Sequence, residues 1–323
     1  MDNYSVLEKW LHKVALSYQM VRETTYDLEN FFHKQKEYKD NHIFVFGLAR
    51  SGSTALLNAI YQSEEFASLS YKDMPFVLAP NLWASISLPS MDSGLKERAH
   101  GDGIKISVKS PEAFEEVFWA TFKRDSDKEI RIKFKSFISQ VISKERKHRY
   151  LSKNNQNVKR SEILDVIFPK SKKLVTFRNP LQQAFSLLTQ HKNFINLAKS
   201  NQFVADYMKW IGHTEFGPNY SQIETNSIKF NNCNDINHWL EQWYLVYGML
   251  EVSLKKKSKF RFICYEKLCL EPNSWKNIQN FVNIEKDNTF LFQESCKDTN
   301  VCANNTLLEK CYRLYDKLKA VSL

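Results

Sequence analysis

No stretch of the 323-residue sequence approaches the ~20 consecutive apolar residues that a membrane-spanning helix needs, and no apolar run follows the polar residues 1–5. The six cysteines all lie in the last third of the chain, and no two of them have the Cys-x-x-Cys spacing of a zinc or redox site. We therefore expect a soluble protein without a signal peptide, with reduced thiols and a cytoplasmic location.

The chain has a large excess of positive charge, +10 from 46 Lys and Arg against 36 Asp and Glu. Such a charge implies an anionic partner: nucleic acid, an acidic membrane face or a polyanionic small molecule. With 43% hydrophobic residues the chain can bury a sizeable core. We expect one domain over residues 1–323, with N-terminal helices in 1–40, an α/β core in 41–285 and a C-terminal helical segment in 286–323.

An apolar strand over residues 43–46 runs into the sequence Gly-Leu-Ala-Arg-Ser-Gly-Ser-Thr, residues 47–54, and then into a helix. Two glycines frame four residues, as in a P-loop, and the backbone N–H groups of such a turn favour an anion. The Lys that a nucleotide triphosphate requires after the second glycine is replaced by Ser53, and the nearest fixed cation is Arg50. The pattern predicts a site for a phosphate-like group, without ATP hydrolysis.

A second strand–loop–helix unit follows downstream. Residues 173–177 have the pattern of a buried strand, Arg178 comes directly after it, and Pro180 begins a helix that carries Ser186. Strands that alternate with helices predict an α/β fold with a parallel sheet, whose ligands bind beyond the carboxyl ends of the strands. Arg178 and Ser186 can bind a second phosphate there. Alternatively, Arg178 forms a surface ion pair and Ser186 is a spacer.

Together the two units resemble the sulfotransferase family that uses 3′-phosphoadenosine 5′-phosphosulfate. Tyr-Leu-Ser-Lys-Asn at 150–154 and Tyr-Glu-Lys-Leu at 265–268 are similar to further segments of that family, so the resemblance covers roughly residues 42–285. It implies a three-layer sandwich with a central parallel sheet, a P-loop-like phosphate-binding loop and extra helices at both ends. The cytosolic branch usually has Lys where Arg50 stands, which suggests a bacterial or carbohydrate-type branch; its late glycine-rich nucleotide segment is missing here.

The resemblance also implies a role for each matched position. The 5′-phosphosulfate would be bound by Arg50, Ser51, Gly52, Ser53 and Thr54. The 3′-phosphate would be bound by Arg178 and Ser186, Lys153 would lie near the transferring group, and Tyr265 near the adenine. Sulfuryl transfer resembles phosphoryl transfer in its need for in-line placement and charge stabilisation, and it requires no metal ion.

The acceptor hydroxyl needs a base, and the residues leave two candidates open. His100 lies on a polar loop over 89–110 and has the right ordinary pKa. Its rivals are Glu112, Glu115 and Glu116, because sugar-directed family members commonly use a Glu in this part of the chain. A helix over 112–122 would place Glu112 and Glu116 on one face. The alternatives are a histidine that binds nothing and carboxylates that stabilise a helix start.

Two other functions compete with a transferase acting on a carbohydrate or small metabolite. A nucleotide kinase or NTPase would use the same loop but lacks the necessary Lys. A nucleic-acid or membrane-binding protein would use residues 123–149, where ten Lys or Arg stand against four Asp or Glu. There we favour a solvated basic face of an amphipathic helix, and we expect no stable nucleic-acid complex. Peripheral contact with an anionic surface stays open, and the sequence does not define an oligomeric state.

Overall fold

The computed structural model describes residues 5–33, 38–87, 96–97, 105–106, 110–224, 228–254, 259–286, 288–294 and 299–323. Its centre is a five-stranded sheet with the order β2-β5-β1-β6-β7, and every pair of neighbours is parallel. The strands are β1 (Ile43–Phe46), β2 (Phe66–Ala67), β5 (Arg149–Lys153), β6 (Lys172–Phe177) and β7 (Phe260–Cys264). The predicted strands at 43–46 and 173–177 are therefore confirmed.

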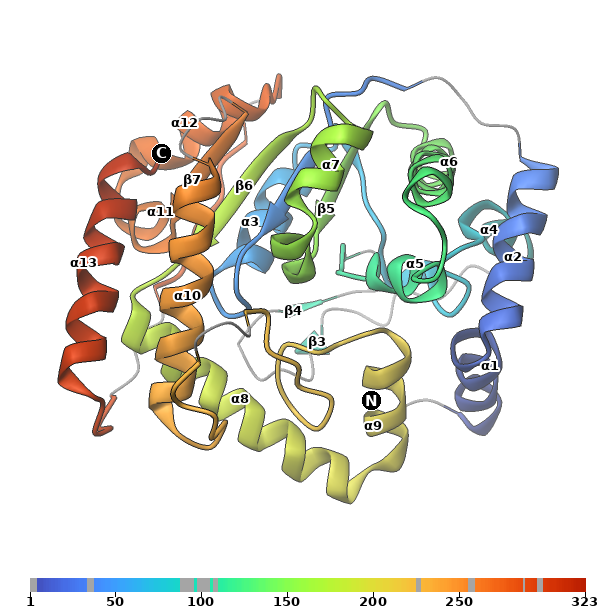
Figure 1. Cartoon of the computed structure of the whole chain (residues 1–323). Coiled ribbons are helices and arrows are strands. Elements are labelled where there is room, and N and C mark those ends of the chain that lie inside the picture. The colour runs from blue at the N-terminus through green and yellow to red at the C-terminus, as the bar shows by residue number, and fades with distance from the viewer. Residues whose placement is uncertain are drawn as a thin grey trace.

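Helices cover both faces of this sheet (Figure 1). One face packs against α3 (Ser53–Tyr61), α11 (Tyr265–Leu270) and α12 (Pro272–Val282). The other packs against α6 (Asp127–Glu145), α7 (Ser161–Ile167), α8 (Pro180–Ser200), α10 (Ile236–Leu254) and α13 (Asn305–Val321). The predicted α/β fold with a three-layer arrangement is confirmed.

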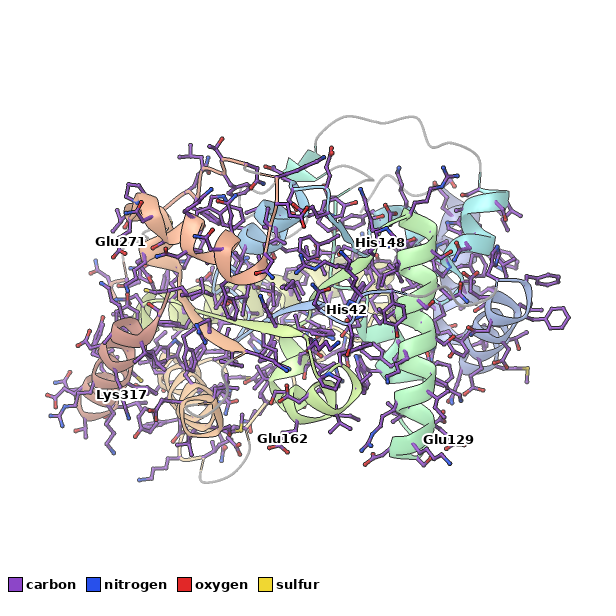
Figure 2. All side chains as sticks on the ribbon, turned by 90° about the horizontal axis from the view of Figure 1, so that it is seen from above. His42, Glu129, His148, Glu162, Glu271 and Lys317 are labelled. Atoms are coloured by element: carbon purple, nitrogen blue, oxygen red, sulfur yellow. The ribbon has the colours of Figure 1, made fainter. Side chains whose placement is uncertain are left out.

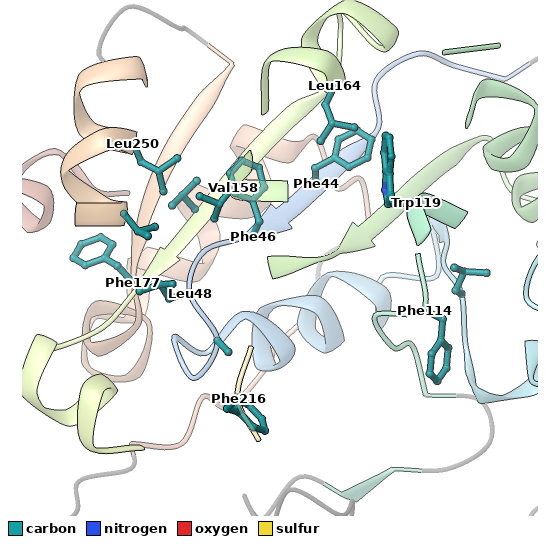
Figure 3. Packing of buried hydrophobic residues seen from close by; sticks show 14 of the residues in the cluster. Phe44, Phe46, Leu48, Phe114, Trp119, Val158, Leu164, Phe177, Phe216 and Leu250 are labelled. Atoms are coloured by element: carbon teal, nitrogen blue, oxygen red, sulfur yellow. The ribbon is translucent and has the colours of Figure 1, made fainter. Parts of the chain in front are cut away.

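The two faces follow from the two-residue period of a strand. In β1, Ile43 and Val45 join the core on the α3 side, whereas Phe44 and Phe46 join the core on the other side. Figure 3 shows Phe44 and Phe46 pointing into that second core, where Leu164 of α7 lies beside Phe44. Because both faces are covered, all four residues of β1 are completely buried, which explains its uninterrupted apolar sequence.

The remaining elements flank this sandwich. The N-terminal helices α1 (Val6–Ser17) and α2 (Gln19–Phe32) were predicted, and they contact α9 (Gln202–Trp210), α4 (Pro80–Ile86), α5 (Glu116–Thr121) and α6. Two short 3₁₀ turns, η1 (Tyr71–Asp73) and η2 (Asn155–Lys159), follow strands β2 and β5, and β3 (Lys96–Glu97) pairs with β4 (Lys105–Ile106) as a separate ribbon. No helix in the described ranges is both long and apolar enough to cross a bilayer.

The basic segment forms the amphipathic helix α6, as predicted, in which Ser126 caps the first turn with Glu129. Figure 2 shows it as a long helix running from Glu129 toward His148. Its apolar residues from Phe134 to Ile142 are buried in the second core. The Lys144 ammonium lies 2.7 Å from the carboxylate of the buried Asp73, so part of the positive charge is already paired inside the protein.

Candidate active site

The loop after β1 makes the predicted glycine-bracketed turn. Gly47 has φ 147° and Gly52 has φ 86°, both in the region that favours glycine. A Cβ atom on Gly47 would lie 2.2 Å from the Thr176 carbonyl oxygen, and one on Gly52 would lie 2.1 Å from the Tyr265 ring. The two glycines therefore let the turn pass closely between β6 and the start of α11. Arg50 also has a positive φ of 68°, which is uncommon for a residue with a side chain.

Buried side chains from two helices hold the backbone of this turn. Gln183 of α8 donates its amide to the carbonyl oxygens of Leu48 and Ala49, at 3.2 and 3.0 Å. The Tyr247 hydroxyl of α10 accepts from Leu48 N at 3.2 Å and donates to the Thr176 carbonyl at 2.8 Å. Because both residues are fully buried, these hydrogen bonds tie the backbone of the turn to the protein core.

The side chains of the turn point in different directions. The Ser51 hydroxyl lies 2.6 Å from the Thr176 hydroxyl and is completely buried, so it braces the turn against β6. Ser53 and Thr54 begin α3 and are also buried, which leaves the N–H groups of the helix start as the polar groups of this stretch. Of these residues, Arg50 has the long polar side chain, and its Nε donates to the Ser186 hydroxyl at 3.0 Å.

That contact joins the two predicted phosphate sites. β1 pairs with β6 in parallel, with Phe46 beside Val175, so the segments that follow both strands leave the sheet at the same edge. Arg178 follows β6, and its Nε lies 3.8 Å from Glu266 Oε1. The same carboxylate accepts from Asn179 N at 2.9 Å. Arg50, Ser186 and Arg178 are thus positioned by one sheet edge and by Glu266 of α11.

Tyr265, which the resemblance predicts near the adenine, begins α11 beside the turn. Its ring packs against Gly52, and its hydroxyl donates to the Gln293 carbonyl at 3.0 Å. Burial raises the pKa of this phenol well above its ordinary range, so it stays protonated.

Lys153 ends β5, next to β1 in the sheet, at the same carboxyl edge as the turn. Asn154 follows it and donates to Glu116 Oε2 at 3.0 Å. Both oxygens of Glu116 accept from the Arg160 guanidinium at 2.6 Å. Glu116 is therefore committed to a bidentate ion pair beside Lys153, which weakens its case as a proton acceptor.

The predicted helix over 112–122 is wrong at its beginning, because α5 starts only at Glu116. Pro111 forms a β-bridge with Ser70, and Glu112 N donates to the Leu69 carbonyl, so this stretch is extended along the segment after β2. Glu112 and Glu116 consequently do not share a helix face. The Glu112 carboxylate instead accepts from the Tyr71 hydroxyl at 3.2 Å and from Ala113 N at 2.9 Å. His100, the other predicted base, lies outside the described residues.

Sequence reasoning missed the side chains that hold the site. Gln183, Tyr247 and Glu266 act through contacts between residues 64 to 199 positions apart in the sequence, and no local spacing reveals such contacts. Glu115, one of the predicted rival bases, has a structural role that was not predicted: it is 1% exposed and accepts from Trp119 Nε1, the Tyr150 hydroxyl and the Ser152 hydroxyl. No group of His, Cys, Asp and Glu suited to a metal ion occurs in the part of the chain that the structure describes.

These observations define an α/β protein with a glycine-bracketed loop between a buried strand and a helix. The sequence profile of the Sulfotransferase family matches residues 42–217, more than half of the 323 residues. The chain therefore belongs to the sulfotransferase family and is an enzyme, a sulfotransferase.

Solved sulfotransferases are similar to the chain at low sequence identity. STF1 from Mycobacterium tuberculosis is 12% identical, with 95% of this chain and 81% of that chain covered and a TM-score of 0.49. STF9 from Mycobacterium avium is 11% identical, with 97% and 78% covered and a TM-score of 0.48. A sulfotransferase from Alicyclobacillus acidocaldarius is 15% identical, with 87% and 94% covered and a TM-score of 0.40. No curated protein sequence matches the chain.

Proposed function

We propose that this sulfotransferase moves a sulfuryl group from 3′-phosphoadenosine 5′-phosphosulfate to the hydroxyl of a carbohydrate or small metabolite. The contact between Arg50 Nε and the Ser186 hydroxyl, at 3.0 Å, carries the proposal. It supports the proposal because it joins the turn after β1 to the helix after β6. A single nucleotide with an anionic group at each end would contact both segments.

The proposed roles follow from the chemistry of each group. N–H groups of residues 51–54 and the Arg50 guanidinium would bind the 5′-phosphosulfate, because a helix start and a fixed cation both favour negative charge. Arg178 and Ser186 would bind the 3′-phosphate, for which a guanidinium offers bidentate geometry. Tyr265 would lie along the adenosine, since its ring is in contact with the turn.

The transfer step would depend on positioning and charge. The acceptor oxygen attacks the sulfur in line, the sulfur–oxygen bond to the nucleotide breaks, and negative charge develops on the leaving phosphate oxygen. Lys153 would stabilise that charge from the end of β5, and the Glu116–Arg160 pair beside it would fix its backbone. One fixed donor of this type lowers a barrier by about 3 kcal/mol. The nucleotide and the acceptor are the proposed partners, and the cytoplasm is the proposed location.

Binding of adenosine 3′,5′-bisphosphate tests the donor assignment. At 100 times the Kd the ligand should stabilise the chain by about 2.7 kcal/mol, seen as a higher melting temperature. Arg178→Ala should weaken binding about 10- to 100-fold, since hydrogen bonds to charged groups are worth about 1.5–3 kcal/mol. Arg313→Ala, a matched change at a residue whose side chain is 83% exposed on α13, should leave the affinity unchanged.

Two results would contradict the proposal. One is the absence of any shift in melting temperature with the bisphosphate. The other is Mg²⁺-dependent ATP hydrolysis by the chain, which would favour a nucleotide kinase or NTPase that uses the same loop.

A further inference from the structure

A segment between α9 and α10 lies against the residues that follow Lys153. Gly212 has φ 73°, and a Cβ atom on it would lie 2.6 Å from Glu116 Cγ, so its backbone packs directly on the Glu116 side chain. Thr214 accepts a hydrogen bond from Gln156 Nε2 at 2.9 Å, and Gln156 belongs to η2, directly after β5. These two contacts place His213, which stands between Gly212 and Thr214, at the carboxyl end of β5.

The His213 ring has a fixed position between aromatic side chains. It is stacked on Phe194, with an interplanar angle of 10° and 6.1 Å between ring centres. It meets the edge of Phe216, which Figure 3 labels, at 4.5 Å. Phe194 belongs to α8, the helix that also carries Ser186, so the helix that contributes to the proposed 3′-phosphate site also supports this imidazole. The His213 side chain keeps 15% of its surface exposed.

Three charged groups on different elements act on the His213 ring. Glu215 Oε2, on the same segment, lies 3.5 Å from His213 Nε2. Lys153 of β5 and Glu112 are close enough to interact with the ring electrostatically. Burial lowers the pKa of His213, and the Lys153 ammonium lowers it further, while Glu215 and Glu112 oppose the change. The imidazole is therefore neutral at neutral pH and able to accept a proton.

We propose that His213 is the general base that accepts the proton of the acceptor hydroxyl, with Lys153 on the leaving side and Glu215 supporting the imidazolium that forms. The assignment rests on the proposed function. In the step, the acceptor O–H bond breaks, its proton passes to the His213 imidazole, and the oxygen forms a bond to sulfur. The sulfur–oxygen bond to the nucleotide breaks, and adenosine 3′,5′-bisphosphate leaves with that electron pair.

The geometry favours His213 over the two glutamates. Both Glu116 oxygens are held by Arg160, and the Glu112 oxygens accept from Tyr71 and from Ala113 N. Both carboxylates are therefore already engaged by hydrogen-bond donors of the protein. Glu112 acts instead as a nearby negative charge that stabilises protonated His213.

A histidine NMR titration tests the location without knowledge of the acceptor. Ring signals are followed over pH in the free chain and with saturating 3′-phosphoadenosine 5′-phosphosulfate, and His213→Asn identifies the His213 signal. The bound donor should shift this signal and raise the pKa of His213, because it adds negative charge near the ring. The exposed His148, labelled in Figure 2, precedes β5 at the opposite sheet edge and should not respond. An unchanged His213 signal with bound donor would overturn the assignment.

Kinetics test the role. His213→Asn should lower turnover about 100-fold or more while bisphosphate affinity stays unchanged, since a general base contributes about 10²–10⁴ in rate. Turnover is followed as release of adenosine 3′,5′-bisphosphate with a panel of sugars and phenols, and the matched control His148→Asn should keep the full rate. In the wild type, protonation of His213 should lower the rate at acid pH. This acid limb of the pH–rate profile should be missing in His213→Asn. If His213→Asn keeps the full rate and the same acid limb as the wild type, the assignment is overturned.

Glu215→Gln keeps the test decisive if His213→Asn does not fold. It retains the imidazole but removes a carboxylate that raises its pKa, so the acid limb should move to lower pH. An acid limb that stays in place in this variant overturns the assignment. Wild-type chain that binds no bisphosphate overturns the proposed function itself, which separates the two failures.

Discussion

At the scale of single residues, Gly52 determines how closely the Tyr265 ring approaches the turn. Gly52→Ala should abolish bisphosphate binding and lower the free energy of unfolding. The new methyl group would collide with the ring at 2.1 Å, and the left-handed backbone alone costs a residue with a side chain about 1–2 kcal/mol. Bisphosphate titration and urea unfolding measure the two effects.

The control for Gly52→Ala is the same change at Gly248 inside α10, where a Cβ atom would meet only Leu314 Cδ2 at 3.9 Å. Gly248→Ala should leave binding unchanged and stabilise the chain by roughly 0.5–1 kcal/mol, because Ala is the better helix former. Wild-type affinity in Gly52→Ala would contradict the close packing of the turn against Tyr265.

His42 makes stability depend on pH. It is completely buried, its Nδ1 accepts from Tyr150 N at 3.1 Å, and burial together with nearby Arg149 lowers its pKa to about 3. The unfolded chain binds this proton near pH 6.5, so the free energy of unfolding should fall as pH drops from about 6.5 toward 3, by up to about 1.4 kcal/mol per pH unit.

His42→Gln should flatten this pH dependence, because Gln can accept from Tyr150 N but does not titrate. Urea unfolding at several pH values measures the slope for both proteins. Part of the pH dependence will remain in the variant, because the pKa values of histidines 12, 191, 213 and 238 are also lowered. Identical slopes for variant and wild type would refute the contribution of His42.

At the scale of elements, Glu115 joins α5 to β5. Its buried carboxylate accepts from the Ser152 hydroxyl at 2.6 Å and the Tyr150 hydroxyl at 3.2 Å, both on β5. Glu115→Gln should lower the free energy of unfolding by about 1–3 kcal/mol, since the amide presents donors to groups that also donate. Glu162→Gln makes the same change at an exposed site on α7 (Figure 2) and should have almost no effect in urea unfolding. Equal stability of the two variants would contradict this role.

Sequence patterns predicted β1 and β6, in which apolar residues predominate, and they missed β5 for a physical reason. Arg149 and Ser152 are polar, yet both are buried in the strand, because Arg149 donates to the carbonyl oxygens of residues 282 and 283, and Ser152 donates to Glu115. These partners lie far away in the sequence. The helix start at Glu112 was wrong for a similar reason: the bridge between Ser70 and Pro111 keeps the chain extended there.

In the candidate site too, local sequence patterns were predicted and contacts between distant residues were not. The turn at residues 47–54 and the order strand–Arg178–helix–Ser186 are local patterns, so the sequence was sufficient to find them. The contact of Arg50 with Ser186 depends on the register of β1 against β6. The approach of His213 to the end of β5 depends on the packing of Gly212 on Glu116, and no spacing in the sequence encodes it.

At the scale of the whole molecule, α13 connects the end of the described chain to the site. It packs along α10 and β7, at the edge of the structure in Figure 1. Its Tyr315 hydroxyl donates to Glu266 Oε2 at 3.2 Å, and Glu266 in turn holds Asn179 N and lies beside Arg178. Tyr315→Phe should therefore weaken bisphosphate binding several-fold, by about 1 kcal/mol for one hydrogen bond.

Isothermal titration with the bisphosphate measures the effect of Tyr315→Phe. Tyr312→Phe removes a hydroxyl from a half-buried residue of the same helix and should leave the affinity unchanged. An equal loss in both variants would mean that α13 acts through general packing and not through Glu266.

The hydrogen bonds from Gln183 to Leu48 and Ala49 have a consequence for inhibitor chemistry. Because Gln183 already donates to both carbonyl oxygens inside the protein, each has at most one lone pair left for an amidine or another cationic group of an inhibitor. Compounds aimed at this turn should therefore carry an anionic group, such as a sulfonate, a phosphonate or a tetrazolate, instead of a cationic one.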